Sequence, residues 1–440
     1  MNTASERYSS LTEALKDSDY KPIVVMGDGQ IAMMLVQECR RQGIPVIVIG
    51  DGKYAAQQLV STPSEQAFWP DDFYINLWEN WDPDLQQDVM TQLIQKLKKT
   101  WSGVTAEFEN VTESLLVFFE SQGVRLTPGR KAFSICRDKL LEKKLFQQKN
   151  VPCANFLELD PDTLEQKKTE INKLLPGFVK TRTMGYDGKW QRSVETFEEV
   201  QRVMEWDFLN QPCILEKKVD FDYEMSVVFS RDETWAIVIN SVQKNHQKNL
   251  LITSESYGIP EETSKEAVEI TKQLAEELEY LGTWAIEFFV IKDGSVLANE
   301  MAPRPHNSGH QTIDWNLLSQ YSFQMLIAQR IDAIRSLEEY RHVWIENLYG
   351  TLFARPRHAN SAVGLVNITG TTVKNIENFL WVRWVLPWNL AVFQMPGIFV
   401  RFYGKPDGKD TKRGHVTINW WREAVNGEID RIRRLLHPNI

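Results

Sequence analysis

The sequence has little cysteine and no excess of positive charge. Its 440 residues include only four cysteines, which are widely scattered and form no CxxC pair. This argues against a zinc ribbon or a disulfide scaffold, and a reducing cytoplasm is the expected compartment. Acidic residues outnumber basic ones, 59 to 50, for a formal net charge of −9. That balance argues against a dedicated nucleic-acid-binding protein.

Long apolar runs are missing as well. The most apolar stretch, residues 379–403, is rich in tryptophan but is interrupted by prolines and arginines, and it contains no uninterrupted run of about 18 apolar residues. Residues 1–21 are polar and acidic, without the basic and apolar regions of a signal peptide. We therefore expect a soluble protein without a membrane partner.

What is present is an ordinary globular composition, 42% hydrophobic and 25% charged. The length suggests about three domains. We expect an N-terminal extension over 1–21, a parallel βαβ domain of the α/β class over 22–128, a central α+β domain over 129–328 and a small β-rich domain over 329–440.

Hydrophobic patterning predicts the elements of the first two domains. A buried strand at 22–26, a glycine turn, helical spacing over 31–42 and a second strand at 46–49 form the βαβ unit, with a helix over 85–99 and a strand over 104–108 beyond it. In the central domain, helices are expected over 138–149, 265–279 and 317–335. Its strands are expected at 177–181, 213–217, 224–229, 235–240, 283–291 and 296–300.

A GxGxxA turn over residues 27–32 connects the first strand to the first helix. Its glycines would let backbone N–H groups approach an anion at the positive end of the helix. Asp51, after the second strand, stands where dinucleotide-binding folds place a ribose-binding acid. A tight turn without a ligand explains the same residues equally well.

Lys180 ends a strand and precedes a loop that contains Gly185 and Gly188. A lysine beside a flexible loop of free N–H groups suits a polyphosphate, although the segment is not a Walker loop. Taken alone, a glycine hairpin with a solvated lysine is the favoured interpretation.

Two acids, Glu287 and Glu300, lie within apolar strands separated by a Lys-Asp-Gly turn, so we expect a hairpin that brings them together. A carboxylate in such a strand is costly to bury unless it is paired or binds a cation. Together with nucleotide phosphates, two facing carboxylates are typical of a Mg²⁺ site. A salt bridge to Arg304 is the alternative.

The segment that follows, Arg304-Pro-His-Asn-Ser-Gly-His310, gathers an arginine, two histidines, an amide and a hydroxyl. Loops collect functional groups of this kind, and arginine suits phosphate or carboxylate. The HxxxH spacing also fits zinc, but no third ligand is evident and we do not favour it.

The order of these segments resembles one family. GDGQ, VTAEFENV at 104–111, VKTRTMGYDGKWQ at 179–191, ILEKKVDFDYEMSV at 214–227, GTWAIEFF at 282–289 and NEMAPRPHNSGH at 299–310 occur in the order found in the N5-carboxyaminoimidazole ribonucleotide synthetases, or PurK family, of ATP-grasp enzymes. The resemblance runs from residue 22 to about residue 418 and implies a three-domain ATP-grasp architecture.

The resemblance implies a site for ATP and Mg²⁺. Lys139 and Lys180 would approach the phosphates, residues 185–191 would fold over them, and Glu287 and Glu300 would bind Mg²⁺. The complete set of positions that match the nucleotide site is Lys139, Lys180, Gly185, Tyr186, Asp187, Gly188, Lys189, Trp190, Gln191, Glu216, Lys217, Lys218, Val219, Glu224, His246, Asn299 and Glu300.

The resemblance also implies 5-aminoimidazole ribonucleotide and bicarbonate as substrates. The positions that match their site are Gln30, Glu107, Tyr186, Lys189, His306, Asn307, Ser308 and Lys405, with Arg304, Asp187 and Lys405 at the carboxylating centre. ATP would phosphorylate bicarbonate to carboxyphosphate, and Asp187 would orient or deprotonate the acceptor amine. The family pattern also implies a cytoplasmic homodimer that acts in purine biosynthesis.

The sequence departs from the family at four positions. Met33 and Thr411 replace basic residues, and Met184 and Trp190 replace glycines of the nucleotide loop. Lost glycines stiffen a loop, and lost cations weaken a phosphate site. Two alternatives follow: an ATP-grasp ligase with another acceptor, and a nucleotide-binding protein without turnover.

Overall fold

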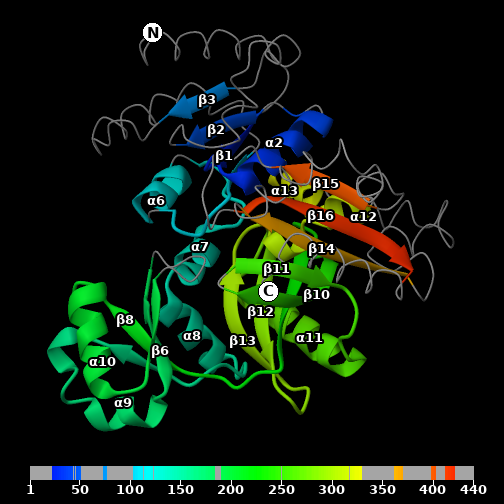
Figure 1. Cartoon of the computed structure of the whole chain (residues 1–440). Coiled ribbons are helices and arrows are strands. Elements are labelled where there is room, and N and C mark those ends of the chain that lie inside the picture. The colour runs from blue at the N-terminus through cyan, green and yellow to red at the C-terminus, as the bar shows by residue number, and fades with distance from the viewer. Residues whose placement is uncertain are drawn as a thin grey trace, which may run out of the picture.

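The computed structural model of the protein describes residues 22–42, 44, 46–50, 73–76, 103–111, 113–121, 123–183, 190–248, 250–316, 318–329, 361–369, 398–402 and 412–421. Within these described residues the strands form two sheets of four strands and one of eight (Figure 1). The mixed α/β and α+β class expected from the sequence is confirmed.

The N-terminal sheet is parallel, in the order β3 (Phe73–Asn76), β2 (Val46–Gly50), β1 (Ile23–Met26), β4 (Gly103–Ala106). Apolar residues fill β1 and β2, as is typical of strands covered on both faces. Helix α2 (Gln30–Gln42) makes the crossover between them, and α6 (Glu113–Ser121) follows β4. The predicted βαβ unit is therefore confirmed, whereas the helix predicted over 85–99 lies outside the described residues.

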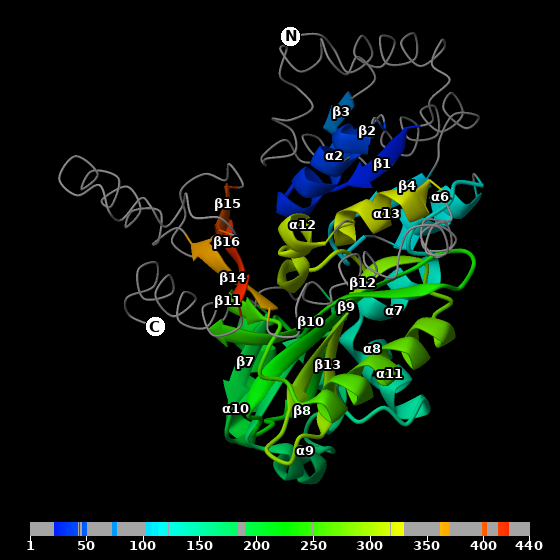
Figure 2. The same cartoon turned by 90° about the vertical axis from the view of Figure 1, so that its right-hand side faces the viewer.

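A second sheet of four strands is antiparallel, in the order β5 (Phe156–Leu159), β8 (Cys213–Lys217), β6 (Gly177–Thr181), β7 (Gln191–Val194). Helices α9 (Lys168–Leu174) and α10 (Phe197–Arg202) pack against it through one apolar cluster. This small sheet lies at the opposite end of the molecule from the parallel sheet (Figures 1 and 2).

The largest sheet is antiparallel and has eight strands. Its order is β13 (Val296–Ala302), β12 (Gly282–Val290), β9 (Tyr223–Arg231), β10 (Ile237–Lys248), β11 (Leu250–Glu255), β14 (Ser361–Thr369), β16 (Lys412–Trp421), β15 (Ile398–Phe402). The β11–β14 pairing joins the strands after residue 360 to this central sheet. The domain boundary at 328/329 stays a prediction.

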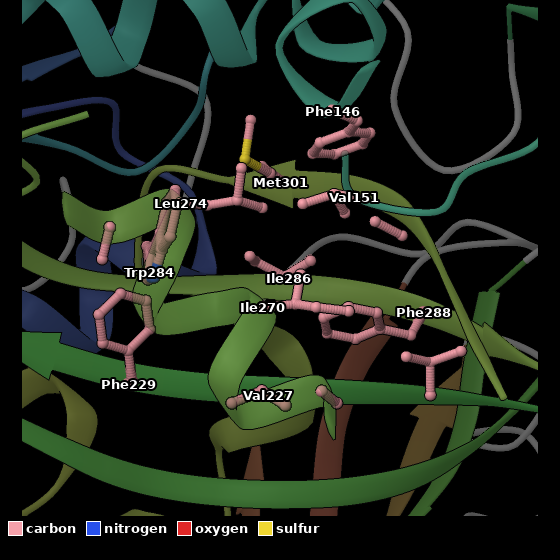
Figure 3. Packing of buried hydrophobic residues seen from close by; sticks show 14 of the residues in the cluster. Phe146, Val151, Val227, Phe229, Ile270, Leu274, Trp284, Ile286, Phe288 and Met301 are labelled. Carbon is pink, nitrogen blue, oxygen red and sulfur yellow. The ribbon is translucent and has the colours of Figure 1, made fainter. Parts of the chain in front are cut away.

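The main apolar core lies between the large sheet and helices α7 (Arg130–Cys136), α8 (Lys139–Gln148) and α11 (Glu261–Glu277). Figure 3 shows its close packing: Phe229 and Trp284 meet edge to face, with ring centroids 5.1 Å apart. Each large apolar side chain buried in this way contributes about 1.5–3 kcal/mol. The core fixes β12 and β13 against α8, which the site below requires.

Helix α13 (Gln320–Ala328) connects the central sheet to the N-terminal unit. Its Tyr321, Met325 and Ala328 pack in one cluster with α2, and its other face lies on β9 and β12. Ser319 and Ser322 form a capping box at its start. The helix predicted over 317–335 thus begins at Gln320, and residues 330–335 lie outside the described residues.

Most predicted elements of the central region are confirmed, with corrections at their ends. The strands predicted at 177–181 and 213–217 have those bounds. The strand predicted at 235–240 begins instead at Ile237, because Trp235 lies in a turn with φ of 70°, and it continues to Lys248. The helix predicted over 265–279 covers Glu261–Glu277, and its N-cap is Pro260. No described helix is both long enough and apolar enough to cross a membrane.

Candidate active site

Two carboxylates face each other on the β12–β13 hairpin. Glu287 and Glu300 are cross-strand partners beside a bulge, so the predicted hairpin is confirmed. His306 Nε2 lies 3.1 Å from Glu287 Oε1, and Lys139 Nζ lies 3.5 Å from Glu300 Oε2. The two glutamate side chains are 22% and 41% exposed, so both reach solvent.

The paired acids can hold a hard cation only with help from other ligands. Among the described residues, no group of three or more histidine, cysteine, aspartate or glutamate side chains is placed to bind a metal ion. The HxxxH alternative for zinc gains no support either: Nδ1 of the buried His310 contacts the Tyr321 hydroxyl at 2.7 Å, and its Nε2 lies 3.1 Å from Gln30 Nε2. Two carboxylates fit a cation that takes most of its ligands from water or phosphate.

A buried cluster of two lysines and one glutamate lies between the small sheet and α8. Glu216 on β8 is 2.7 Å from Lys180 Nζ on β6 and 3.6 Å from Lys143 Nζ on α8. Burial alone would raise the pKa of Glu216, but the charges of Lys143 and Lys180 lower it to about 2. Glu216 is therefore a carboxylate shared by two cations.

Lys143 also contacts the large sheet. Its Nζ donates to the backbone carbonyl of Asn299 on β13 at 2.8 Å, and its side chain is 1% exposed. One buried ammonium thus joins α8, the small sheet and the strand that carries Glu300. Lys143 is not among the candidates predicted from the sequence, although a charged residue among the apolar positions of a helix is a signal that could have found it.

The start of α8 adds two more ionisable side chains, Lys139 and Glu142. Burial would lower the pKa of Lys139, but the negative charges of Glu300 and Glu142 outweigh it and raise that pKa. Burial raises the pKa of Glu142 to about 8, although Lys143 and Lys139 oppose the shift. The Glu142 carboxyl accepts from Met301 N at 2.5 Å, which fixes β13 against the helix. Glu142 too was missed from the sequence.

The segment after β8 leads to the remaining nucleotide-site candidates. Lys217 and Lys218 are exposed and Val219 is half-buried. Burial, together with the charge of Glu287, raises the pKa of Glu224 to about 7. His246 on β10 is 43% exposed, and its Nε2 lies 3.6 Å from Glu255 Oε1.

Residues 304–310, hereafter the arginine loop, connect the acid pair to the N-terminal unit. Nε of Arg304 donates to Glu109 Oε2 at 2.9 Å, a carboxylate other than the two that the sequence offers as its alternative partners. Burial would raise the pKa of Glu109, but Arg304 lowers it. Asn307 Oδ1 accepts from Gln30 Nε2 at 2.7 Å, which places the loop against the start of α2.

His306 and Ser308 continue the arginine loop into the large sheet. His306 Nδ1 is 2.8 Å from Ser308 Oγ, which is 2.6 Å from Ser226 Oγ on β9. A path of polar contacts therefore runs from Glu287 through His306 and Ser308 to Ser226 on β9. The structure brings together Gln30, His306, Asn307 and Ser308, as the sequence predicts.

The glycine turn before α2 receives a carboxylate of the protein itself. Gly29 N donates to Glu107 Oε1 at 2.5 Å, and Ala32 N donates to Glu107 Oε2 at 3.1 Å. Gly27 has φ of 103°, and a Cβ at Gly27 or Gly29 would collide with the Glu107 side chain. The anion that these amides meet in the structure is therefore the Glu107 carboxylate, as in the alternative of a tight turn without a ligand.

Part of the predicted site lies outside the described residues. This is the case for Asp51 and for the site candidates Gly185, Tyr186, Asp187, Gly188, Lys189 and Lys405.

Gln191, expected in the nucleotide loop, belongs to β7 and pairs with Lys180. Trp190 is partly buried, and the centroid of its ring is 6.3 Å from that of Phe208. It packs against the apolar cluster of the small four-stranded sheet. Met33 is 6% exposed within the N-terminal core.

The chain is similar to known proteins in both sequence and fold. The ATP-grasp domain family matches residues 144–321. The N5-carboxyaminoimidazole ribonucleotide synthase of Saccharolobus solfataricus is 28% identical over 427 residues, which cover 96% of this chain and 98% of that protein.

Two solved structures share the fold. An ADP complex of the N5-carboxyaminoimidazole ribonucleotide synthetase purK aligns with a TM-score of 0.72 at 26% identity, covering 94% of this chain and 96% of that one. The Aspergillus clavatus N5-carboxyaminoimidazole synthase, in complex with ADP and 5-aminoimidazole ribonucleotide, aligns with a TM-score of 0.73 at 19% identity, covering 96% and 99%. The second likeness concerns the fold alone.

Proposed function

We propose that this chain, which belongs to the ATP-grasp ligases of the N5-carboxyaminoimidazole ribonucleotide synthase type, carboxylates 5-aminoimidazole ribonucleotide. The reaction consumes ATP and bicarbonate and releases the N5-carboxy product, ADP and phosphate, as a step of purine biosynthesis. The observation that carries the proposal is the continuous path from the paired acids Glu287 and Glu300 through the arginine loop to Gln30. This path would connect the proposed nucleotide site to the proposed acceptor site.

The nucleotide side is proposed to bind ATP with Mg²⁺. Glu287 and Glu300 would hold the ion, because their carboxylates face each other and a Mg²⁺ site needs only one or two protein carboxylates besides phosphate oxygens. The ion would neutralise charge on the phosphates as the phosphoryl group is transferred. Lys180 and Lys139, each beside a carboxylate, are proposed to contact those phosphates.

The phosphoryl group is proposed to pass to bicarbonate, which is a poor electrophile until it is activated. Arg304 would offset the negative charge that develops on the transferred group, and its ion pair with Glu109 fixes its direction. Residues 185–189 are proposed to close over the nucleotide and exclude water, since carboxyphosphate hydrolyses readily.

The acceptor is proposed to bind between the arginine loop and the start of α2. Gln30, His306, Asn307 and Ser308 converge there, and Glu107 borders the turn. Asp187 would take the proton of the acceptor amine, and Tyr186, Lys189 and Lys405 would complete the site. We further propose a cytoplasmic homodimer, and the domain bounds 22–128, 129–328 and 329–440.

A second candidate function is a ligase of the same type with a different acceptor. Met33 favours it: this side chain, which stands where the family carries an arginine, lies in the apolar core and supplies no charge. An acceptor that lacks the ribonucleotide phosphate would need no cation at this place.

The test is an ADP-release assay on the purified full-length chain. We expect ADP only when Mg²⁺, ATP, bicarbonate and 5-aminoimidazole ribonucleotide are all present, and at least about a 100-fold loss of kcat in Glu300→Ala. ADP release that ignores the ribonucleotide but responds to another amine would favour the second candidate. Binding of Mg·ATP without ADP release for any acceptor would indicate a protein without turnover.

A further inference from the structure

We propose that Gln320, a buried residue at the start of α13, is a positioning residue that sets the acceptor side of the site by holding the main chain of the arginine loop. The kinetic test of this inference rests on the proposed function. The structural test, which measures how firmly the loop backbone is held, rests only on the contacts of Gln320.

The side-chain amide of Gln320 binds both backbone polar groups of one loop residue, His306. Its Oε1 accepts from His306 N at 2.8 Å, and its Nε2 donates to His306 O at 2.7 Å. The side chain is 0% exposed, so water does not replace these bonds. An amide that donates and accepts against one residue fixes both the position and the orientation of that backbone.

The loop is shaped around this amide. A Cβ placed on Gly309 would lie 2.7 Å from Gln320 Oε1, so a residue with a side chain would displace the amide. Asn307 and Ser308 lie between His306 and Gly309, the two residues next to this amide. Asn307 contacts Gln30, and Ser308 contacts Ser226. Movement of the His306 backbone would therefore shift the acceptor-facing side chains together.

Gln320 is itself anchored on two further elements. Its N–H, which has no partner within α13, donates to Thr312 Oγ1 at 3.1 Å, and its carbonyl accepts from Thr283 Oγ1 on β12 at 3.0 Å. Gln320 therefore connects the arginine loop to β12, the strand that carries Glu287. The position of the loop's acceptor-facing side chains thus depends on the position of the acid pair.

Gln324, one helical turn later, is a matched control. It is also 0% exposed, and its amide makes three comparable bonds, from Thr283 N at 2.5 Å and to Thr105 Oγ1 and Thr127 O at 2.7 and 3.1 Å. None of these partners belongs to the arginine loop. Gln320→Leu and Gln324→Leu should thus destabilise the fold similarly and differ only in what they do to the loop.

The experiment compares both leucine variants and the isosteric Gln320→Glu, whose carboxylate cannot donate to the His306 carbonyl. We expect kcat/KM for the ribonucleotide to fall about 10- to 100-fold in both Gln320 variants, as for a reacting group displaced by a fraction of an ångström. The Kd for Mg·ADP should stay within about twofold. Gln324→Leu should change kcat/KM by less than about threefold.

Hydrogen–deuterium exchange provides a readout that needs no substrate. The His306 and Gly309 region should exchange faster in Gln320→Leu than in Gln324→Leu. Equal exchange, or equal kinetic loss in the two leucine variants, would overturn the proposal. If the wild-type chain releases no ADP with the ribonucleotide, the proposed function fails, and exchange alone decides the role of Gln320.

Discussion

Replacement of Lys143 by methionine tests whether the buried lysine cluster stabilises the protein. Methionine keeps the length and apolar contacts of the side chain but removes the ammonium that is 3.6 Å from Glu216 and 2.8 Å from the Asn299 carbonyl. Loss of one partner from a buried pair costs about 3–5 kcal/mol. Glu216 keeps Lys180 at 2.7 Å, so we expect the lower end, about 3 kcal/mol of unfolding free energy.

The next residue provides a matched control. Lys144 also lies 3.6 Å from a carboxylate, that of Glu158, but the two side chains are 49% and 42% exposed. An exposed pair contributes about 0.2–1 kcal/mol, so Lys144→Met should cost less than about 1 kcal/mol. Urea unfolding of wild type and both variants, followed by tryptophan fluorescence, measures the difference. Equal costs for the two substitutions would refute the argument that burial decides the effect.

The same cluster predicts a dependence on pH. The pKa of Glu216 is about 2 in the folded chain and near 4.5 as an unperturbed carboxyl. A lowered folded pKa adds stability that is fully present above 4.5 and is lost as the pH falls toward 2. The advantage of wild type over Glu216→Gln should therefore shrink across this window, by up to about 3 kcal/mol. A difference that stays constant from pH 7 to pH 3 would contradict the prediction.

Three further changes test other parts of the site. Glu107→Gln removes the charge that caps α2 and should cost about 1 kcal/mol in urea unfolding, and no loss would exclude the capping role. Trp190→Gly removes a ring that packs on Phe208 and should cost about 2–3 kcal/mol while ATP turnover persists; loss of turnover in a folded variant would instead place Trp190 in the nucleotide site. Glu300→Gln should raise the Mg²⁺ concentration needed for half-maximal ADP release, and a wild-type response to Mg²⁺ would exclude Glu300 as a ligand.

Local patterns were sufficient to predict the elements that carry the site. The apolar alternation of the 177–181 and 213–217 segments predicts strands with the observed bounds, and the Lys-Asp-Gly turn predicts the hairpin that pairs Glu287 with Glu300. The predicted bounds of a strand are wrong where a turn, rather than the alternation of residue types, decides the residue at which it begins. Trp235 has strand-forming character, but it lies in a turn with a positive φ, with its ring 3.8 Å from the Arg231 guanidinium.

Partnerships between charged residues were much harder to predict, because they join distant segments. Arg304 is 195 positions from Glu109, its carboxylate partner, and the Glu107 side chain caps a turn 78 positions before it. Neither pairing has a local sequence signal. The sequence offered the acid pair as an alternative partner for Arg304, whereas the structure pairs Arg304 with Glu109.

These pairings also explain why the net charge of the chain says so little about its site. Lys180, Arg304 and Lys139 each lie within 3.5 Å of a carboxylate, those of Glu216, Glu109 and Glu300. Burying an isolated cation would be prohibitive, so each buried cation needs an acid beside it, and the acid adds to the negative total. A chain with a net charge of −9 can therefore build a cationic site for anionic substrates, since the acids that hold its cations also account for part of that charge.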